Sequence, residues 1–286
     1  LYTDSWSGKP VGDLGDKGDS WSYDEASNTL TLKTGTFCLR NYGYDSYNNC
    51  IKWNVKIEPG ATLQEARIGS EYHNGYTVTN AGTISGGTFY GKVICEAGAV
   101  ISGGTFKGAA RVDAAGGEVT IEDGTFEEVS YTSGMTVKAA GTLTINGGTF
   151  KGKRICSVDI DNCEKIVING GSFESSLTDL KRTTETIING GLFNDKLYVA
   201  GDKCTVNGGL FTTEDDPLPA GATVNGGYFT AERAGLVAID ATDVPVYLPV
   251  AVAADGTVNK WSADAYSTVY VTPNTSVTLK PTRKLE

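Results

Sequence analysis

One short segment of this chain combines the side chains that suit sugar binding. Three tyrosines alternate with asparagine, aspartate and glycine between Cys38 and Cys50. Tyrosine rings stack on the faces of sugars, while amide and carboxylate groups bond to sugar hydroxyls. We therefore expect a carbohydrate platform, which aromatic residues further along the chain would extend; the alternative is that these rings pack on an outer wall with their hydroxyl groups in water. The candidate glycan-binding residues are Tyr42, Tyr44, Tyr47, Trp53, Tyr72 and Tyr76.

A pair of aspartates, Asp159 and Asp161, lies in a dense acidic stretch. Side chains two residues apart on a strand point to the same side, so this pair could hold a calcium ion or act as a carboxylate pair. Basic residues follow at Lys165, Lys181 and Arg182, which leaves a lyase-like grouping open. No other repeat offers carboxylates at the aligned position, and we assign no catalytic residue. Calcium is the one cofactor for which the sequence offers ligands.

The six cysteines do not have the spacing of a metal site, and the chain contains one histidine. Zinc is therefore not expected. Two pairs are close enough in sequence for a local disulfide, and both are left open: Cys38 with Cys50, and Cys156 with Cys163. The remaining two, Cys95 and Cys204, are expected to fill the core.

A repeat determines the elements that must position these residues. One clear copy reads Leu143-Thr144-Ile145-Asn146-Gly147-Gly148-Thr149-Phe150. Each copy has Ile or Val five residues before its phenylalanine and then a glycine pair, which is broken only at Asp123. A period of about twenty residues with β-branched and glycine positions is typical of a solenoid built from short strands. The copies end at Phe89, Phe106, Phe126, Phe150, Phe173, Phe193, Phe211 and Phe229.

Equivalent residues on successive turns of such a solenoid lie about 4.8 Å apart. We therefore expect the phenylalanines to form one internal stack, with Phe37 of a degenerate first copy at its head, and the Ile and Val positions to form a second. The asparagines from Asn146 to Asn225 should form a ladder of side-chain amides at a turn. These repeated residues are structural, and none is expected to be catalytic.

The Thr-Ile-x-Gly-Gly-Thr-Phe pattern resembles the right-handed parallel β-helix proteins of the pectate-lyase-like superfamily, and more narrowly the repeat regions of bacterial surface proteins. The resemblance covers about residues 30–230. It implies an all-β, right-handed, single-stranded parallel β-helix (solenoid) with non-repeat caps. Residues 1–29 would be the N-terminal cap, 30–232 the helix, and 233–286 a C-terminal β cap or a bridge to a further domain. The superfamily includes lyases, hydrolases, adhesins and non-catalytic sugar binders, so the resemblance leaves the activity open.

Both ends of a solenoid need a cover, because an open turn exposes core side chains and a strand edge. We expect Trp6 and Trp21 to cover the first turn. Towards the other end, the residue before the phenylalanine changes from Thr or Ser to Leu192, Leu210 and Tyr228, which would place an apolar stripe on the outside. Soluble proteins seldom leave such a stripe bare, and we expect residues 244–252 to cover it.

Composition limits the partners. A net charge of −10 argues against nucleic acid and anionic membranes. No run approaches the roughly eighteen apolar residues of a membrane span. The chain begins at Leu1 rather than Met, so we expect a fragment or a processed product.

The favoured function is a monomeric, non-catalytic module, secreted or anchored at the cell surface, that binds a polysaccharide or host glycan or acts as an adhesin. The alternatives are a calcium-dependent polysaccharide lyase and a purely structural spacer.

Overall fold

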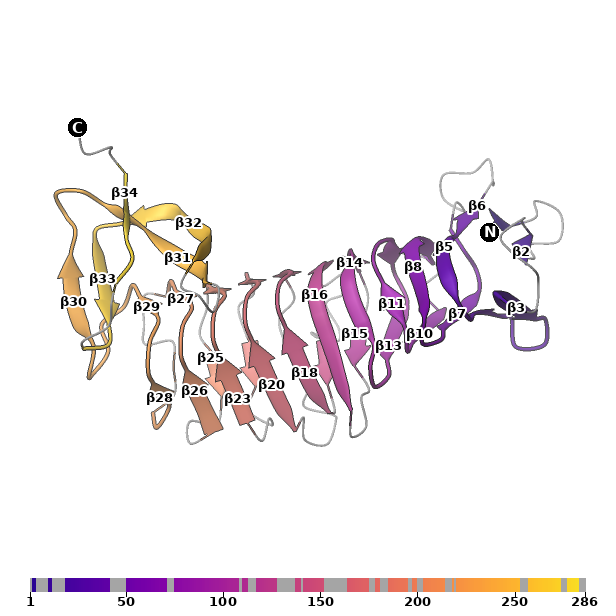
Figure 1. Cartoon of the computed structure of the whole chain (residues 1–286), viewed down its shortest axis with the longest axis horizontal. Coiled ribbons are helices and arrows are strands. Elements are labelled where there is room, and N and C mark those ends of the chain that lie inside the picture. Colours follow the sequence, from indigo (N-terminus) through magenta and orange to yellow (C-terminus); the bar gives the residue numbers. More distant parts are fainter. Residues whose placement is uncertain are drawn as a thin grey trace.

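The computed structural model describes residues 2–3, 10–11, 19–41, 50–70, 75–107, 110–112, 117–127, 137–139, 141–151, 164–174, 178–180, 185–194, 197–199, 203–213, 218, 220–252, 257–273 and 277–282. Within these ranges the chain forms β-strands and no α-helix. The strands stack side by side into one elongated parallel solenoid (Figure 1). The expected all-β parallel solenoid is therefore confirmed.

Each turn in the first half of the solenoid contributes a strand to each of three faces. The first face begins with β3 (Trp21–Asp24), which pairs antiparallel with β4. All later pairs in this sheet are parallel. Its successive parallel strands are β4 (Thr29–Leu32), β7 (Asn54–Ile57), β10 (Thr77–Asn80), β13 (Lys92–Cys95), β15 (Ala110–Val112) and β17 (Val137–Ala139).

The isoleucine face carries the Ile and Val positions of the repeat. It begins at β5 (Gly35–Cys38), and two of its strands, β14 and β16, continue into the next face. Its other strands are β8 (Ala61–Glu65), β11 (Thr83–Ile84), β14 (Val100–Phe106), β16 (Glu118–Phe126), β18 (Thr142–Ile145), β20 (Lys165–Ile168), β23 (Glu185–Ile188), β26 (Cys204–Val206) and β28 (Thr223–Val224).

The phenylalanine face carries the repeated rings. Besides the ends of β14 and β16, its strands are β9 (Arg67–Ile68), β12 (Thr88–Phe89), β19 (Thr149–Phe150), β21 (Ser172–Phe173), β24 (Leu192–Phe193), β27 (Leu210–Phe211) and β29 (Tyr228–Phe229). Small additional pairs are formed by β1 (Tyr2–Thr3) with β2 (Pro10–Val11) and β6 (Arg40–Asn41), and by β22 (Thr178–Leu180) with β25 (Leu197–Val199).

The eight phenylalanines from Phe89 to Phe229 form one continuous internal stack, as expected. Neighbouring ring centroids lie 4.7–5.0 Å apart, and the rings are within 13° of parallel. Every ring is at most 1 % exposed. Burying each large side chain contributes roughly 1.5–3 kcal/mol, so this stack is a main source of the fold's stability.

The expectation that Phe37 heads this stack is wrong. Phe37 pairs with Leu63, which pairs with Ile84, so Phe37 heads the isoleucine column instead. The phenylalanine position in the first turns is taken by Ile68, which pairs with Phe89, and by Ile51, which forms a bridge to Ile68. The two columns therefore exchange residue types at the N-terminal end.

The expected asparagine ladder is present. The amide Nδ2 of Asn169, Asn189, Asn207 and Asn225 each donates to Oδ1 of the asparagine one turn earlier, at 2.8–2.9 Å. The first member, Asn146, donates to the carboxylate of Glu122 at 3.0 Å. Each rung therefore fixes the position of the turn in the next one.

The C-terminal strands cover part of the solenoid's end and one of its sides. The strand β33 (Thr268–Val271) lies antiparallel to both β29 and β30 (Val237–Asp240). The strand β31 (Val246–Val252) pairs with β32 (Val258–Tyr266) and β34 (Lys280–Pro281). These elements gather at one end of the solenoid (Figure 1).

The expected cover of the apolar stripe is confirmed. Val246, Leu248 and Val250 are buried in one cluster with Leu210, against which Leu192 and Tyr228 also pack. The N–H of Gly191 donates to the carbonyl of Val250 at 3.0 Å, which joins the cover to the solenoid. At the other end Trp21 is buried, 4 % exposed, in the main core, while Trp6 lies outside the described residues.

Candidate functional site

The residues expected to bind glycans fall into three groups. Tyr42, Tyr44, Tyr47 and Tyr72 lie outside the described residues. Trp53 is 1 % exposed and packs in the core with Tyr23 at a centroid distance of 6.0 Å. This burial excludes Trp53 from a surface platform, because its ring has no face open to a sugar.

Tyr76 is the one candidate whose side chain is described and partly open to solvent. Burial is the main cause that raises the pKa of its hydroxyl, and the neighbouring Cys50 raises it further. Its carbonyl accepts a hydrogen bond from the N–H of Lys92 at 3.2 Å. The backbone of Tyr76 therefore lies beside the turn that follows Tyr90.

The cysteines behave as core residues where they are described. Cys38 and Cys50 are not joined in a disulfide; Cys50 is buried, and the Cys38 sulfur lies 3.8 Å from Oε1 of Gln64. The local staple considered for this pair is therefore absent. Cys95 and Cys204 fill the core, as expected, at 1 % and 2 % exposure. Cys156 and Cys163 lie outside the described residues.

The candidate calcium ligands, Asp159 and Asp161, lie outside the described residues, as do Lys181 and Arg182. Lys165 is described, and its ammonium group forms an ion pair with Glu185 on the next strand at 2.8 Å. Across the described ranges, no group of three or more His, Cys, Asp and Glu side chains could hold a metal ion.

A surface cluster of one tyrosine and two basic residues lies near the N-terminal end of the solenoid. Tyr90, directly after the first phenylalanine of the stack, has the guanidinium carbon of Arg67 at 5.5 Å from its ring centroid and the ammonium nitrogen of Lys107 at 5.8 Å. Lys107 also pairs with Glu127 at 3.6 Å. We call Arg67, Tyr90 and Lys107 the solenoid cluster. The carbonyl of Arg67 accepts the N–H of Ile51 at 2.7 Å, so the cluster lies beside the bridge between Ile51 and Ile68.

A second cluster lies on the C-terminal cap. Tyr247 pairs across the sheet with Lys280, and Trp261 lies on the next strand opposite Pro249. The ammonium nitrogen of Lys280 is 6.0 Å from the ring centroid of each aromatic residue. We call Tyr247, Trp261 and Lys280 the cap cluster. Residues on either side of Tyr247 are buried against the apolar stripe, so Tyr247 points away from the solenoid, and both aromatic rings are partly exposed.

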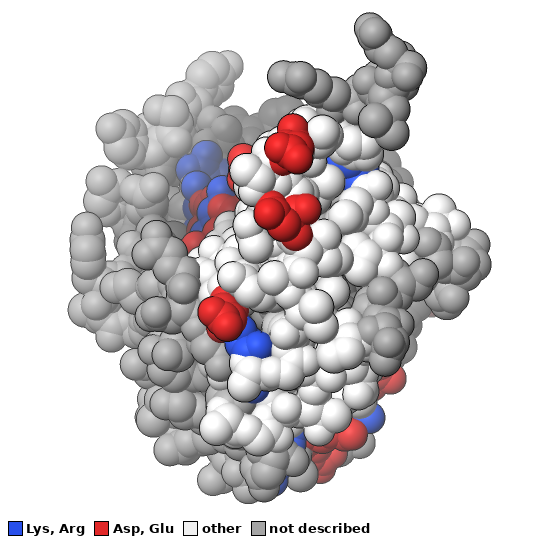
Figure 2. All heavy atoms as spheres, turned by 90° about the vertical axis from the view of Figure 1, so that its left-hand side faces the viewer, with Lys and Arg blue, Asp and Glu red and all other residues white. Residues whose placement is uncertain are grey.

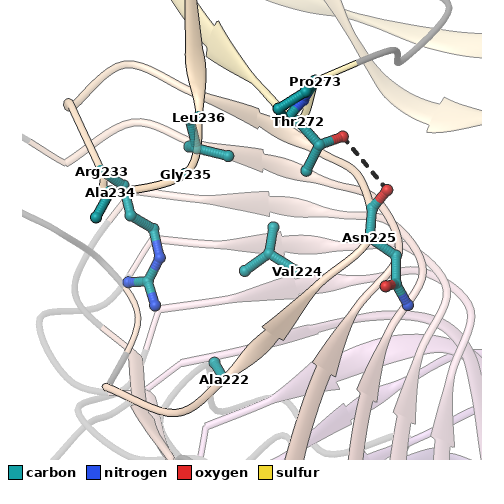
Figure 3. A pocket seen from close by; sticks show the side chains of 9 residues that line it. All are labelled: Ala222, Val224, Asn225, Arg233, Ala234, Gly235, Leu236, Thr272 and Pro273. Atoms are coloured by element: carbon teal, nitrogen blue, oxygen red, sulfur yellow. Dashed lines mark hydrogen bonds between the residues drawn. The ribbon is translucent and has the colours of Figure 1, made fainter.

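An open pocket of about 690 Å³ lies at the C-terminal end of the solenoid. Figure 3 shows Val224 on the last strand of the isoleucine face, with the Arg233 guanidinium on one side and Asn225 on the other. Nη1 of Arg233 donates to the carbonyl of Leu218 at 3.0 Å, and the Thr272 hydroxyl donates to the carbonyl of Asn225 at 3.4 Å. We call this space the end pocket; its lining residues are Ala222, Val224, Asn225, Arg233, Ala234, Gly235, Leu236, Thr272 and Pro273.

Sequence reasoning missed the cap cluster and the end pocket. The members of the cap cluster are far apart in the chain and come from three strands, so no local motif announces them. A weak signal was present, since Trp261 follows Asn259 and Lys260 and precedes Ser262 in a segment outside the repeat, where an apolar core position is not expected. Tyr90 was likewise visible, because it follows the phenylalanine and must point outwards.

The chain matches no protein-family model, no curated protein and no solved structure. Among the described residues, no helix is long and apolar enough to cross a membrane. The function must therefore be argued from the geometry and chemistry of the clusters.

Proposed function

We propose that this protein is an extracellular, non-catalytic β-helix module that binds glycans at its surface, and that the ligand contains an acidic sugar. The cap cluster is the observation that carries the proposal. Two partly exposed aromatic rings share one lysine at 6.0 Å, on the side of the cap that faces away from the solenoid. The solenoid cluster repeats this chemistry with Tyr90 between Arg67 and Lys107.

Both parts of the chemistry favour such a ligand. The C–H face of a sugar ring packs on an aromatic ring, and a contact of this kind contributes roughly 0.5–1.5 kcal/mol beyond the area that it buries. A carboxylate on the same sugar would replace the weak cation–π contact of Lys280 with a charge-assisted hydrogen bond, which is about twice as strong as a neutral one. Neutral sugars should therefore bind more weakly than uronic or sialic acids.

The overall charge of −10 opposes long polyanions, which are repelled by the rest of the surface. A short glycan with one acidic sugar, or a polymer with widely spaced acidic residues, escapes most of this repulsion because exposed charges are screened over about 8–10 Å. The proposal is therefore for sparsely charged glycans. A densely charged polymer such as pectate would need calcium to bridge it.

The test is a glycan array, with and without calcium, followed by calorimetry on the glycans that bind. Trp261→Ala should weaken binding of an acidic glycan about tenfold, which corresponds to about 1.4 kcal/mol. Lys280→Met should remove the preference for the acidic glycan over its neutral analogue. Lys260→Met is the matched control, since Lys260 is an exposed lysine of the same strand as Trp261, and it should leave the preference unchanged.

Three results would count against the proposal. No binding to any glycan on the array would favour a structural spacer. Unsaturated products in an absorbance assay would favour a lyase. Binding that persists in a Trp261→Ala, Tyr90→Ala double variant would show that neither cluster is the binding surface. Thermal unfolding of each variant should match that of the wild type, because all of these side chains are at the surface.

A further inference from the structure

The last strand of the isoleucine face lacks the neighbour that every internal strand of the column has. Val224 pairs with Val206 on one side, and in the part of the chain that is described no strand pairs with its other side. Phe229, at the end of the phenylalanine column, is covered by β33 through its pairing with Tyr270. The C-terminal cap therefore closes one face of the final turn and leaves another open, as Figure 3 shows at the front of the stack.

The exposed fractions of the Ile and Val side chains on this face also distinguish its last strand from the internal ones. The internal members of the column from Ile84 to Val206 are at most 1 % exposed, whereas Val224 is partly exposed and lies in the wall of the end pocket. Ala222 and Leu236, also partly buried, complete the apolar part of the pocket. Seen onto this end of the molecule, the described surface is largely uncharged, with a few separate acidic and basic side chains (Figure 2). An apolar side chain placed over Val224 would therefore remove the last exposed step of the column from water.

Two hydrogen-bond acceptors beside Val224 also have no donor among the described residues. Along the ladder, the backbone N–H of each asparagine donates to the carbonyl of the column residue one turn earlier, as Asn225 does to Val206 at 2.7 Å. The next acceptor in this series is the carbonyl of Val224, and no described residue donates to it. The next acceptor in the side-chain ladder is Oδ1 of Asn225, which likewise receives no hydrogen bond from a described residue.

We propose that the end pocket is an acceptor site for an extended polypeptide segment from a partner protein, which adds one further parallel strand to the isoleucine face. The site dictates the chemistry of that segment. A β-branched apolar residue lies over Val224, and the next residue is an asparagine, whose backbone N–H donates to the Val224 carbonyl and whose side-chain amide donates to Asn225. Main-chain hydrogen bonds supply affinity in this mode of recognition, and the pockets for alternate side chains supply selectivity.

The repeat of the protein itself provides the probe. A synthetic, C-terminally amidated peptide that copies residues 142–146 contains Ile followed by Asn in the required order and ends before the residues that would meet β33 over Phe229. It should bind saturably and shift the NMR signals of the Val224 backbone and the Asn225 side-chain amide. A peptide in which proline replaces the asparagine lacks both donors and should lose at least tenfold in affinity. This comparison uses the wild-type protein, so it does not depend on the folding of any variant.

Two protein variants locate the site. Val224→Lys places a charge over the column and should abolish peptide binding, whereas Val237→Lys changes an exposed valine, 49 % accessible, that does not line the pocket, and should bind as the wild type does. No NMR shift at Val224 and Asn225, or equal binding of the proline peptide, would overturn the proposal. Concentration-dependent self-association that Val224→Lys abolishes, without peptide binding, would overturn it too, because the occupant would then be a second copy.

Discussion

Cys95 shows how a single residue joins the first face to the turn beside it. Its sulfur lies 3.9 Å from Nδ2 of Asn80, a fully buried residue. Oδ1 of the same asparagine accepts a hydrogen bond from the N–H of Gly82 at 3.1 Å. Burial raises the pKa of the Cys95 thiol to about 12, and the contact with Asn80 only partly opposes that effect. The thiol therefore stays neutral in the folded protein at physiological pH.

This raised pKa predicts a loss of stability at high pH. Below about pH 8 the thiol is protonated in both states and contributes no pH dependence. Above about pH 9 the unfolded chain releases the proton while the folded protein keeps it, so the free energy of unfolding falls by up to about 1.4 kcal/mol per pH unit until the folded thiol titrates. Cys95→Ala lacks this effect. Its stability deficit relative to the wild type, measured by urea unfolding, should therefore shrink by about 1.5–2 kcal/mol between pH 7 and pH 10; a constant deficit would contradict the buried neutral thiol.

For single residues, the sequence predicted burial correctly where it follows from the repeat. It failed where the pairing register of the strands decides which face a side chain occupies. Cys95 and Cys204 were recognised as core fillers. Phe37 was misplaced because Gly-Thr-Phe looks the same on either face, and only the pairing of Phe37 with Leu63 assigns it to the isoleucine column. Trp53 was taken for a surface ring because a tyrosine-rich segment precedes it in the sequence, although its ring is buried in the main core.

The element that makes the turns stack is the glycine pair. An alanine methyl at Gly190 would lie 2.4 Å from the carbonyl oxygen of Asn169, and the equivalent glycines at 147, 170, 208 and 226 meet the same carbonyl one turn earlier at 2.3–2.4 Å. The second glycine of the pair, such as Gly191 at φ +109°, has a backbone conformation that other residues rarely adopt. The pair therefore serves two separate requirements, close approach at its first position and positive φ at its second.

Gly190→Ala should destabilise the protein by about 2–3 kcal/mol, because the backbone of two turns must separate to admit the methyl group. Gly75→Ala is the matched control: nothing lies within 4 Å of the added methyl, and its φ is not in the left-handed region. The control should change stability by less than about 0.5 kcal/mol. Chemical unfolding of both variants gives the comparison. Equal stability of the two would show that successive turns are not packed as closely as the Gly190 contact requires.

The repeat made the strands, the phenylalanine stack and the asparagine ladder predictable, because each side chain meets its own equivalent one turn away. The two aromatic–basic clusters follow no such rule. The members of the cap cluster, Tyr247, Trp261 and Lys280, meet only because β31 pairs with both β32 and β34. Pairing between strands that share no repeat is set by tertiary packing, and sequence patterns report it poorly.

For the whole molecule, the informative prediction was that residues 244–252 cover the apolar stripe. It rested on a change of residue type over three consecutive turns, which is a property of the stacked solenoid and not of any one strand. The cover places Leu248, fully buried, in one cluster with Leu210, and so joins the cap sheet to the solenoid wall. The cap cluster lies on the other side of the same sheet, so its position relative to the solenoid depends on this contact.

Leu248→Lys should release the cap sheet from the wall without unfolding the solenoid. A charged ammonium group cannot be accommodated among Leu210, Val246 and Val250 without a partner, and the loss of the leucine's burial alone costs about 2–5 kcal/mol. We expect increased binding of a hydrophobic dye, since Leu192 and Leu210 become accessible, and faster proteolysis within residues 241–257, while the far-ultraviolet spectrum stays that of a β-protein. Val252→Lys is the control, because Val252 lies on the same strand and is 50 % exposed. If Leu248→Lys also abolished the β-spectrum, the cap sheet would be required for the solenoid to fold and would be more than its cover. Such a requirement is known for repeat arrays whose terminal turns depend on capping.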